Sequence, residues 1–306
     1  MSAIAKILSE QIQEEGPIRF DRFMEVALYE PDLGYYRRKR DPFGKRGDFF
    51  TAAQIQPLFG RIMAADAARL EPGRRAFDLG AGRREMAHAF GESYTEIEHG
   101  QTIPEDLSGF IFANEFFDAL PVRSAIRREG SLRESLVDWR DGRFVWTIGP
   151  PLDPNAAAYA AKYWPAREDG DRFEIGERAL EWLRTIAARM RCGTLLIVDY
   201  GFQTRETLRF PAGTLMSYSR HRAEPDVLAE PGERDITAHV AFDAIRDEAL
   251  SLGFECPLFE TLAQRVLRTV AREPAIVQDH QSRQQLKTLL AMGDTFLVME
   301  LKMAGK

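Results

Sequence analysis

The chain has little of several features that define whole classes of protein. It contains 2 cysteines, Cys192 and Cys256, among 306 residues. That is too few for a disulfide-stabilised scaffold or a cysteine-rich zinc site, and it is typical of a reducing compartment. No apolar run approaches the roughly 20 residues that a membrane-spanning helix needs. The formal net charge of −6 disfavours a broad nucleic-acid-binding surface.

The N-terminus lacks the features of a targeting segment. It has neither the apolar core of a signal peptide nor the arginine-rich, acid-poor composition of a transit peptide. Instead, Glu10, Glu14 and Glu15 stand among apolar residues at helical spacing. We therefore expect this segment to be a folded helix of a cytoplasmic protein.

One stretch, residues 74–85, organises the rest of the chain. It reads as a short buried strand, the acid Asp78, and a turn containing Gly80 and Gly82. Such a turn lets a ligand approach the backbone closely. A dinucleotide site needs glycine or a small residue where this chain has Glu85, so that interpretation is poor. The remaining alternatives are the acidic-x-Gly-x-Gly turn of S-adenosylmethionine (SAM) methyltransferases and an ordinary strand–turn–helix junction.

Polar residues follow several other predicted strands. Glu98 comes 20 residues after Asp78, about the spacing at which an acid meets ribose hydroxyls in such folds. Asn114 and Glu115 follow a buried strand, and Asp199 follows another. Open α/β sheets bind ligands at the carboxyl ends of their strands. We therefore predict a mainly parallel sheet with the Asp78 strand at its centre, although Asn114 and Glu115 would also serve as simple caps.

The rest of the chain divides around this sheet. Residues 1–72 are predicted to form an N-terminal helical segment and a cofactor-covering loop, and residues 73–306 the core. The core has insertions at about 122–176 and 202–234. The first insertion includes three predicted antiparallel strands and a surface connection at 149–170, and the second is predicted to be irregular and to cover the site.

Several motifs together resemble the MidA-like family, which includes a mitochondrial assembly factor of respiratory complex I with arginine methyltransferase activity. The most specific is the run Asn-Glu-Phe-Phe-Asp-Ala-Leu-Pro at 114–121, which is far longer than a chance glycine match. The others are Gly47-Asp48-Phe49-Phe50-Thr51, Asp78-Leu79-Gly80-Ala81-Gly82, Asp199-Tyr200-Gly201 and Asp235-Ile236-Thr237-Ala238-His239-Val240.

This resemblance implies an α/β fold: a Rossmann-like seven-stranded methyltransferase sheet with an N-terminal helical extension and inserted antiparallel strands and loops. It implies S-adenosyl-L-methionine as cofactor. The residues that it assigns to the cofactor are Asp78, Gly80 and Gly82 at the methionine end, Glu98 at the ribose, Gly47, Asp48 and Thr51 in the covering loop, and Asn114, with Glu115, facing the methyl group.

The expected activity is SAM-dependent methylation of protein arginine, and the resemblance implies a protein substrate such as a respiratory-complex subunit. Two departures from the family pattern support an alternative. Arg84 stands in place of the usual third glycine, and the segment from Glu98 to Phe110 is much shorter than in the family. The alternative is a methyltransferase fold that has lost catalysis and acts as a binding or assembly protein.

Methyl transfer from a sulfonium mainly requires that donor and acceptor be aligned and water excluded. A carboxylate can hold a guanidinium acceptor by paired hydrogen bonds. Glu115 is the first candidate for this role, followed by Asp118 and Asp199. His221 and His239 are alternative proton acceptors, although structural roles suit them better. No residue group has the spacing of metal ligands.

Overall fold

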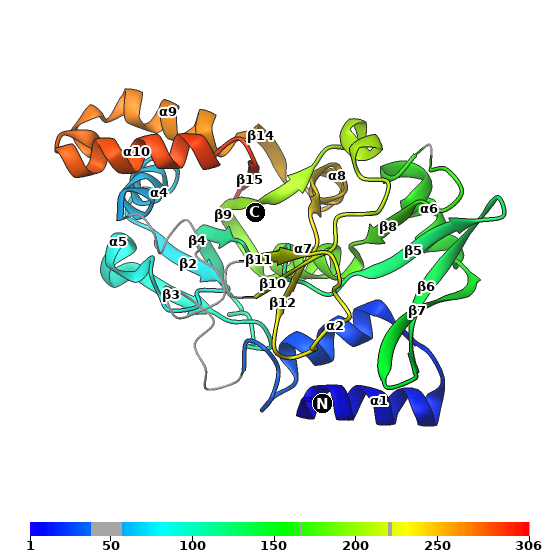
Figure 1. The fold of residues 1–306 in the computed structure, drawn as a ribbon. Coiled ribbons are helices and arrows are strands. Elements are labelled where there is room, and N and C mark those ends of the chain that lie inside the picture. The colour runs from blue at the N-terminus through cyan, green and yellow to red at the C-terminus, as the bar shows by residue number, and fades with distance from the viewer. Residues whose placement is uncertain (38–56, 166, 220–221, 306) are drawn as a thin grey trace. The chain divides into compact units, whose positions relative to one another are not determined.

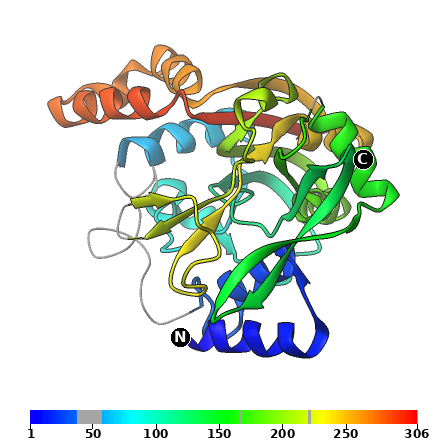
Figure 2. The same ribbon diagram turned by 45° about the vertical axis from the view of Figure 1, so that its right-hand side comes forward.

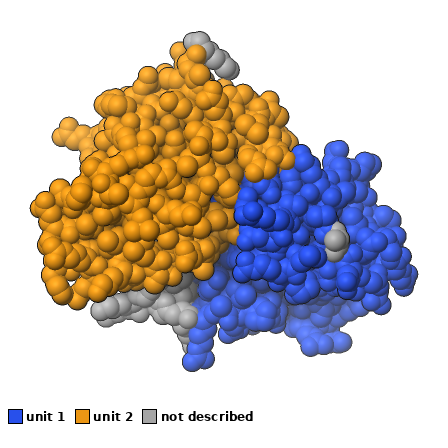
Figure 3. Space-filling view, turned by 90° about the horizontal axis from the view of Figure 1, so that it is seen from above, with its two compact units in different colours: residues 1–50, 119–178, 202–243 blue, residues 51–118, 179–201, 244–306 orange. Residues whose placement is uncertain are grey.

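The computed structural model describes all residues except 38–56, 166, 220–221 and 306. The chain divides into two compact units, coloured separately in Figure 3. Unit 1 contains Met1–Phe50, Ala119–Arg178 and Phe202–Asp243, and unit 2 contains Thr51–Asp118, Ala179–Gly201 and Ala244–Lys306. The predicted covering-loop residues Gly47, Asp48 and Thr51, and also His221, lie outside the described residues.

Unit 2 is built on a mixed sheet in the order β14-β15-β9-β4-β2-β3 (Figure 1). Its strands are β2 (Arg75–Leu79), β3 (Tyr94–Ile97), β4 (Leu107–Asn114), β9 (Met190–Phe202), β14 (Glu255–Thr261) and β15 (Phe296–Met303). Strands β3, β2, β4 and β9 pair in parallel, and β15 pairs antiparallel with both β9 and β14. The predicted parallel core is therefore confirmed.

The prediction that the Asp78 strand lies at the centre is wrong. Strand β2 lies next to β3, which ends the sheet among the described strands. The cause is the short connection at 98–106, which contains no helix or strand. The chain thus passes from β3 directly into β4, and β2 lies one strand from the edge.

The helices of unit 2 are α4 (Pro57–Leu70), α5 (Ala87–Phe90), most of α7 (Glu177–Arg189), most of α8 (Phe242–Ser251), α9 (Leu262–Arg272) and α10 (His280–Met292). Apolar side chains of α4, α9 and α10 form a buried core with side chains of this sheet. Phe59, Phe110, Phe112 and Val298 are among the fully buried side chains of this core. Such burial contributes about 1.5–3 kcal/mol for each large apolar side chain.

A charged cluster is buried in the same unit. Arg265 of α9 is 1% exposed, and its guanidinium donates to Asp66 Oδ2 at 2.6 Å and Glu300 Oε2 at 2.8 Å. Thr269 also donates to Asp66, at 3.1 Å, and Arg268 pairs with Glu260. The cluster therefore joins α4, α9, β14 and β15 through charged side chains that, apart from Arg268, are buried.

Unit 1 contains two small antiparallel sheets and the N-terminal helices α1 (Ala3–Glu15) and α2 (Phe20–Tyr29). The first sheet includes the long hairpin that Figure 2 shows in green. Its strands are β1 (Ile18–Arg19), β5 (Arg123–Arg128), β6 (Ser131–Arg140), β7 (Arg143–Pro151) and β8 (Arg172–Ile175). The three predicted antiparallel strands are confirmed by β5, β6 and β7.

Two sequence interpretations fail in unit 1. The predicted surface connection at 149–170 contains helix α6 (Pro154–Tyr163), which begins where Asp153 caps the N–H groups of Asn155 and Ala156. The predicted irregular stretch at 202–234 contains a short 3-10 helix and parts of a three-stranded sheet. These strands are β10 (Met216–Ser219), β11 (Arg222–Glu224) and β12 (Asp235–Thr237). Segments this short carry too few residues for a visible period.

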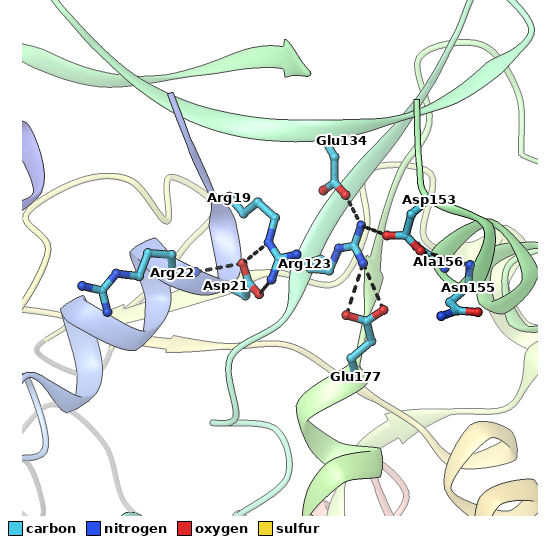
Figure 4. Close-up of polar contacts among 9 residues, drawn as sticks. All are labelled: Arg19, Asp21, Arg22, Arg123, Glu134, Asp153, Asn155, Ala156 and Glu177. Carbon is cyan, nitrogen blue, oxygen red and sulfur yellow. Dashed lines mark hydrogen bonds and ion pairs between the residues drawn. The ribbon is translucent and has the colours of Figure 1, made fainter. Parts of the chain in front are cut away.

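An arginine at the start of β5 joins several elements of unit 1 (Figure 4). Arg123 is 4% exposed, and its guanidinium contacts three carboxylates. They are Glu134 of β6, Asp153 at the start of α6 and Glu177 at the start of α7. The buried charge is thus paired several times, which is what burial of a guanidinium requires.

Candidate functional site

The predicted site residues of unit 2 gather at one edge of the sheet. Strands β2, β4 and β9 are neighbours, with Asp78 opposite Phe112 and Asn114 opposite Val198 (Figure 1). Because these strands are parallel, their carboxyl ends lie at the same edge. Asp78, Asn114 and Asp199 are therefore brought together, as predicted, and Glu98 follows the neighbouring end of β3.

The turn after β2 has the backbone that its glycines allow. Gly80 has φ +67° and Gly82 has φ +56°. A Cβ on Gly80 would lie 2.7 Å from Phe116 Cδ2, so a larger residue would clash. Arg84, in the place of the usual third glycine, also has a positive φ of 63°. Its side chain turns to Glu96, with Nε 2.5 Å from Oε2. The turn thus keeps a glycine-like conformation despite the arginine.

The helix after this turn is shorter than predicted. The sequence indicates a helix over 85–90, whereas α5 covers Ala87–Phe90. A single turn of helix contributes little dipole. The amide of Gly82 instead donates to Glu98 Oε1 at 2.9 Å. The glycine turn and the predicted ribose-holding acid are therefore tied together.

Asp78 lies in an acidic environment at the centre of this edge. It is 4% exposed and accepts a hydrogen bond from the Tyr94 hydroxyl at 2.9 Å. Burial raises the pKa of Asp78 to about 7. The charges of Glu98, Glu85 and Glu96 add to this increase, and the Tyr94 hydrogen bond opposes it. Four carboxyl groups close together favour a cationic ligand.

Tyr94 is a site residue that the sequence analysis missed. It begins β3, and its hydroxyl reaches Asp78 because β3 pairs with β2 in parallel, Ala76 opposite Tyr94. The sequence predicts both strands but not their pairing register. A tyrosine at the start of the strand that precedes Glu98 was the available signal.

The Asp199 side chain of β9 holds the loop that follows β4. This carboxylate is fully buried, and Oδ2 accepts the N–H groups of Phe117 at 2.9 Å and Asp118 at 3.3 Å. Its other oxygen accepts the N–H of Tyr200 at 2.9 Å. Burial and the nearby charge of Glu115 raise the pKa of Asp199 to about 8. These contacts make Asp199 a positioning residue for the loop.

Glu115 occupies the first position of that loop in an unusual conformation. Its φ is 50°, in the left-handed region that side chains rarely adopt. Its N–H donates to Val198 O at 3.0 Å, and its Oε1 accepts from Asn114 Nδ2 at 3.3 Å. Non-glycine residues in this conformation cluster at functional sites, because the surrounding structure must hold them there.

Asn114 adds an acceptor beside Glu115. Its Oδ1 is buried and has no hydrogen-bond partner among the described residues. A buried polar atom without a partner costs about 1–3 kcal/mol, so such an atom in a native site calls for a ligand donor. Asp118, another predicted catalytic residue, is 5% exposed and is the last residue of the first chain segment of unit 2.

His239 belongs to unit 1, where its backbone N–H donates to Thr214 and burial lowers the pKa of its ring. In the part of the chain that the structure describes, no group of three or more His, Cys, Asp or Glu side chains could hold a metal ion. Over the same residues, no helix is long and apolar enough to span a membrane.

Comparison with known proteins bears directly on this arrangement. Residues 66–259 match a family described as "Putative S-adenosyl-L-methionine-dependent methyltransferase". A crystal structure from Burkholderia thailandensis, of a protein described as a "likely methyl transferase" and bound to S-adenosyl-homocysteine, is similar with a TM-score of 0.89 and 27% identity. It covers 98% of this chain and 92% of that chain.

Curated relatives match over most of their length. One is the protein arginine methyltransferase NDUFAF7 homolog, mitochondrial, of Drosophila melanogaster, at 27% identity over 82% of this chain and 71% of the relative. Another is protein arginine methyltransferase NDUFAF7, mitochondrial, of Bos taurus, at 25% identity over 97% of this chain and 80% of the relative.

These relatives contradict the predicted cytoplasmic location, because their names are those of mitochondrial proteins. The N-terminal helix was interpreted correctly as folded structure, since Ile4, Leu8 and Ile12 of α1 are buried. The error lay in the next step. A folded amphipathic helix reports on packing and gives no information about the compartment.

Proposed function

We propose that this chain, which belongs to the family of S-adenosyl-L-methionine-dependent methyltransferases, methylates arginine side chains of a protein substrate. The match confirms the resemblance to MidA-like proteins, the Rossmann-like methyltransferase fold and SAM as cofactor. The observation that carries the arginine proposal is the Asn114–Glu115 pair at the end of β4. It presents two acceptors for a guanidinium, the Glu115 carboxylate and Asn114 Oδ1, at the edge of the sheet where the glycine turn lies.

The residues of unit 2 fit the cofactor. SAM carries an ammonium and a sulfonium, and the edge holds the carboxyl groups of Asp78, Glu85, Glu96 and Glu98. When bound, SAM supplies the methyl group attached to its sulfonium. We assign Asp78, Gly80 and Gly82 to the methionine end and Glu98 to the ribose hydroxyls.

Glu115 is the proposed holder of the acceptor. A guanidinium has five N–H donors and no acceptor, so it needs acceptor groups around it. The Glu115 carboxylate and the buried Asn114 Oδ1 are adjacent groups of that kind. The hydrogen bonds from the loop amides to Asp199 fix the backbone that presents Glu115.

We propose a respiratory-complex subunit as the acceptor protein. The names of the relatives, protein arginine methyltransferases, support a protein substrate, and the resemblance to a complex I assembly factor is the basis for the choice of a respiratory-complex subunit. We also assign Gly47, Asp48 and Thr51, which lie outside the described residues, to the covering of the cofactor.

A transfer assay tests the proposal. The purified chain is incubated with SAM labelled in its methyl group and with membrane and soluble protein extracts, and the labelled products are hydrolysed to amino acids. We expect labelled methylarginine. Label on another amino acid would contradict the choice of acceptor. SAM binding measured by calorimetry without any transfer would support the alternative, a catalytically silent binding or assembly protein.

SAM binding should depend on pH through Asp78. Because the pKa of this carboxyl is raised to about 7, a fall in pH through 7 protonates it and removes a negative charge that favours the cationic ligand. Affinity should therefore be full above pH 7 and fall about tenfold by pH 6 if the ionised form is required. Calorimetry between pH 6 and 8.5 measures this dependence.

Asp78→Asn provides the control for the pH dependence. Asparagine keeps the shape and can still accept from Tyr94, but it does not titrate. The variant should bind SAM weakly at every pH in this range. A variant with the same pH dependence as the wild type would show that another group is responsible.

A further inference from the structure

The short connection between β3 and β4 has aromatic side chains around it. His99 follows Glu98, and Phe116 follows Glu115. Both contact Trp182 of α7: the ring centroids are 6.1 Å apart for His99–Trp182 and 5.0 Å for Phe116–Trp182. All three residues belong to unit 2. We name His99, Phe116 and Trp182 the aromatic cluster.

The aromatic cluster is continuous with the predicted cofactor residues. Phe116 lies against Gly80, since a Cβ on that glycine would meet its ring. At the other end, His99 is the neighbour of Glu98, whose carboxylate accepts the N–H of Gly82. The cluster therefore extends from the glycine turn to the acid assigned to the ribose.

Trp182 is the member best placed to bind a flat ligand. The edge of Phe116 meets its ring at an interplanar angle of 88°, and His99 is tilted by 40°. The Trp182 side chain is neither fully buried nor fully exposed, whereas Phe116 is buried. Part of the indole thus remains accessible beside two strand ends.

We propose that Trp182 and His99 form the binding face for the adenine base of SAM. This inference rests on the proposed function, because it assumes that SAM binds at this edge. The connection at 98–106 contains no helix or strand that could contact the base. An indole and an imidazole provide stacking surfaces instead, and aromatic rings bind bases mainly by stacking.

The test compares three forms of the full chain: wild type, Trp182→Ala and Trp182→Phe. Calorimetry measures the dissociation constants of S-adenosyl-homocysteine and of adenosine, which contains only the base and ribose. Trp182→Ala should weaken both by about 5- to 150-fold, the range for loss of one base-stacking contact. Trp182→Phe keeps a ring and should retain most of the affinity.

Intrinsic fluorescence gives a second measurement that does not depend on catalysis. The other tryptophans, Trp139, Trp146 and Trp164, all lie in unit 1. Adenosine should change the emission of the wild type, and this change should be absent in Trp182→Phe. Trp139→Phe, which alters a ring tilted against Phe144 with centroids 4.6 Å apart in unit 1, is the matched control and should keep the change.

The outcomes separate the two proposals. A wild type that binds neither S-adenosyl-homocysteine nor adenosine would overturn the proposed function and this inference with it. A wild type that binds, together with folded Trp182→Ala of equal affinity, would overturn the inference alone and leave Trp182 as a packing residue. If Trp182→Ala does not fold, an adenosine-induced emission change that persists in Trp182→Phe would overturn it equally.

Discussion

Glu115→Gln should lower the rate of methyl transfer to protein arginine about 30- to 4,000-fold and leave SAM affinity unchanged. The substitution keeps the shape of the side chain and removes the charge that pairs with a guanidinium. Loss of such a pair costs about 2–5 kcal/mol when the partner charge stays buried, and about 1.4 kcal/mol corresponds to a factor of ten. Calorimetry with SAM and the labelled transfer assay measure the two effects separately.

The chain offers a matched control for backbone strain. Glu129 also has a left-handed φ, of 52°, but it is exposed in the turn between β5 and β6 in unit 1. Glu129→Gln should therefore have no effect on transfer. Equal transfer rates for Glu115→Gln and wild type would exclude Glu115 as the residue that holds the acceptor.

Arg265→Met should destabilise the protein by about 3–5 kcal/mol. The substitution removes the Arg265 guanidinium from the buried cluster. Asp66 and Glu300 then lose the cationic group that lies nearest to each of them. Removing one partner of a buried ion pair is costly because the remaining charge stays desolvated. Urea unfolding followed by circular dichroism would show the loss as a lower transition midpoint.

A control and a rescue belong with this experiment. Arg268 lies three residues further along α9, and its side chain is 29% exposed, so Arg268→Met should cost much less. Replacing Asp66 and Glu300 by Asn and Gln in the Arg265→Met chain should restore part of the stability. An Arg265→Met chain as stable as the wild type would show that the buried carboxylates find other partners.

Much of the sheet follows from local sequence. The strand ends at Asp78, Asn114 and Asp199 could be predicted because each follows a run of apolar residues, and parallel strands end at one edge. Helix α6 could not, because its Pro and Ala content resembles a connection. The signal is the Asp153 cap followed by Pro154 at the first helical position.

The site shows the same limit at the level of single contacts. Asp78 and Glu115 could be named as candidates, because an acid at the carboxyl end of a buried strand lies where open α/β sheets bind ligands. The hydrogen bonds from Tyr94 to Asp78 and from the loop amides to Asp199 could not, because they depend on strand register and on backbone conformation. The division into 1–72 and 73–306 stays a prediction.

The division of each unit into three chain segments has a consequence for synthesis. A ribosome delivers the chain from the N-terminus, yet β9 pairs with β15, whose residues come about 100 positions later, Leu297 opposite Asp199. Asp66 likewise lacks its buried ion-pair partner until Arg265, 199 positions later, has been synthesised. Until β15 emerges, one side of β9 is an unpaired strand edge, the kind of surface that associates with other chains. This edge of β9 is therefore exposed in the growing chain for as long as the intervening residues are being synthesised.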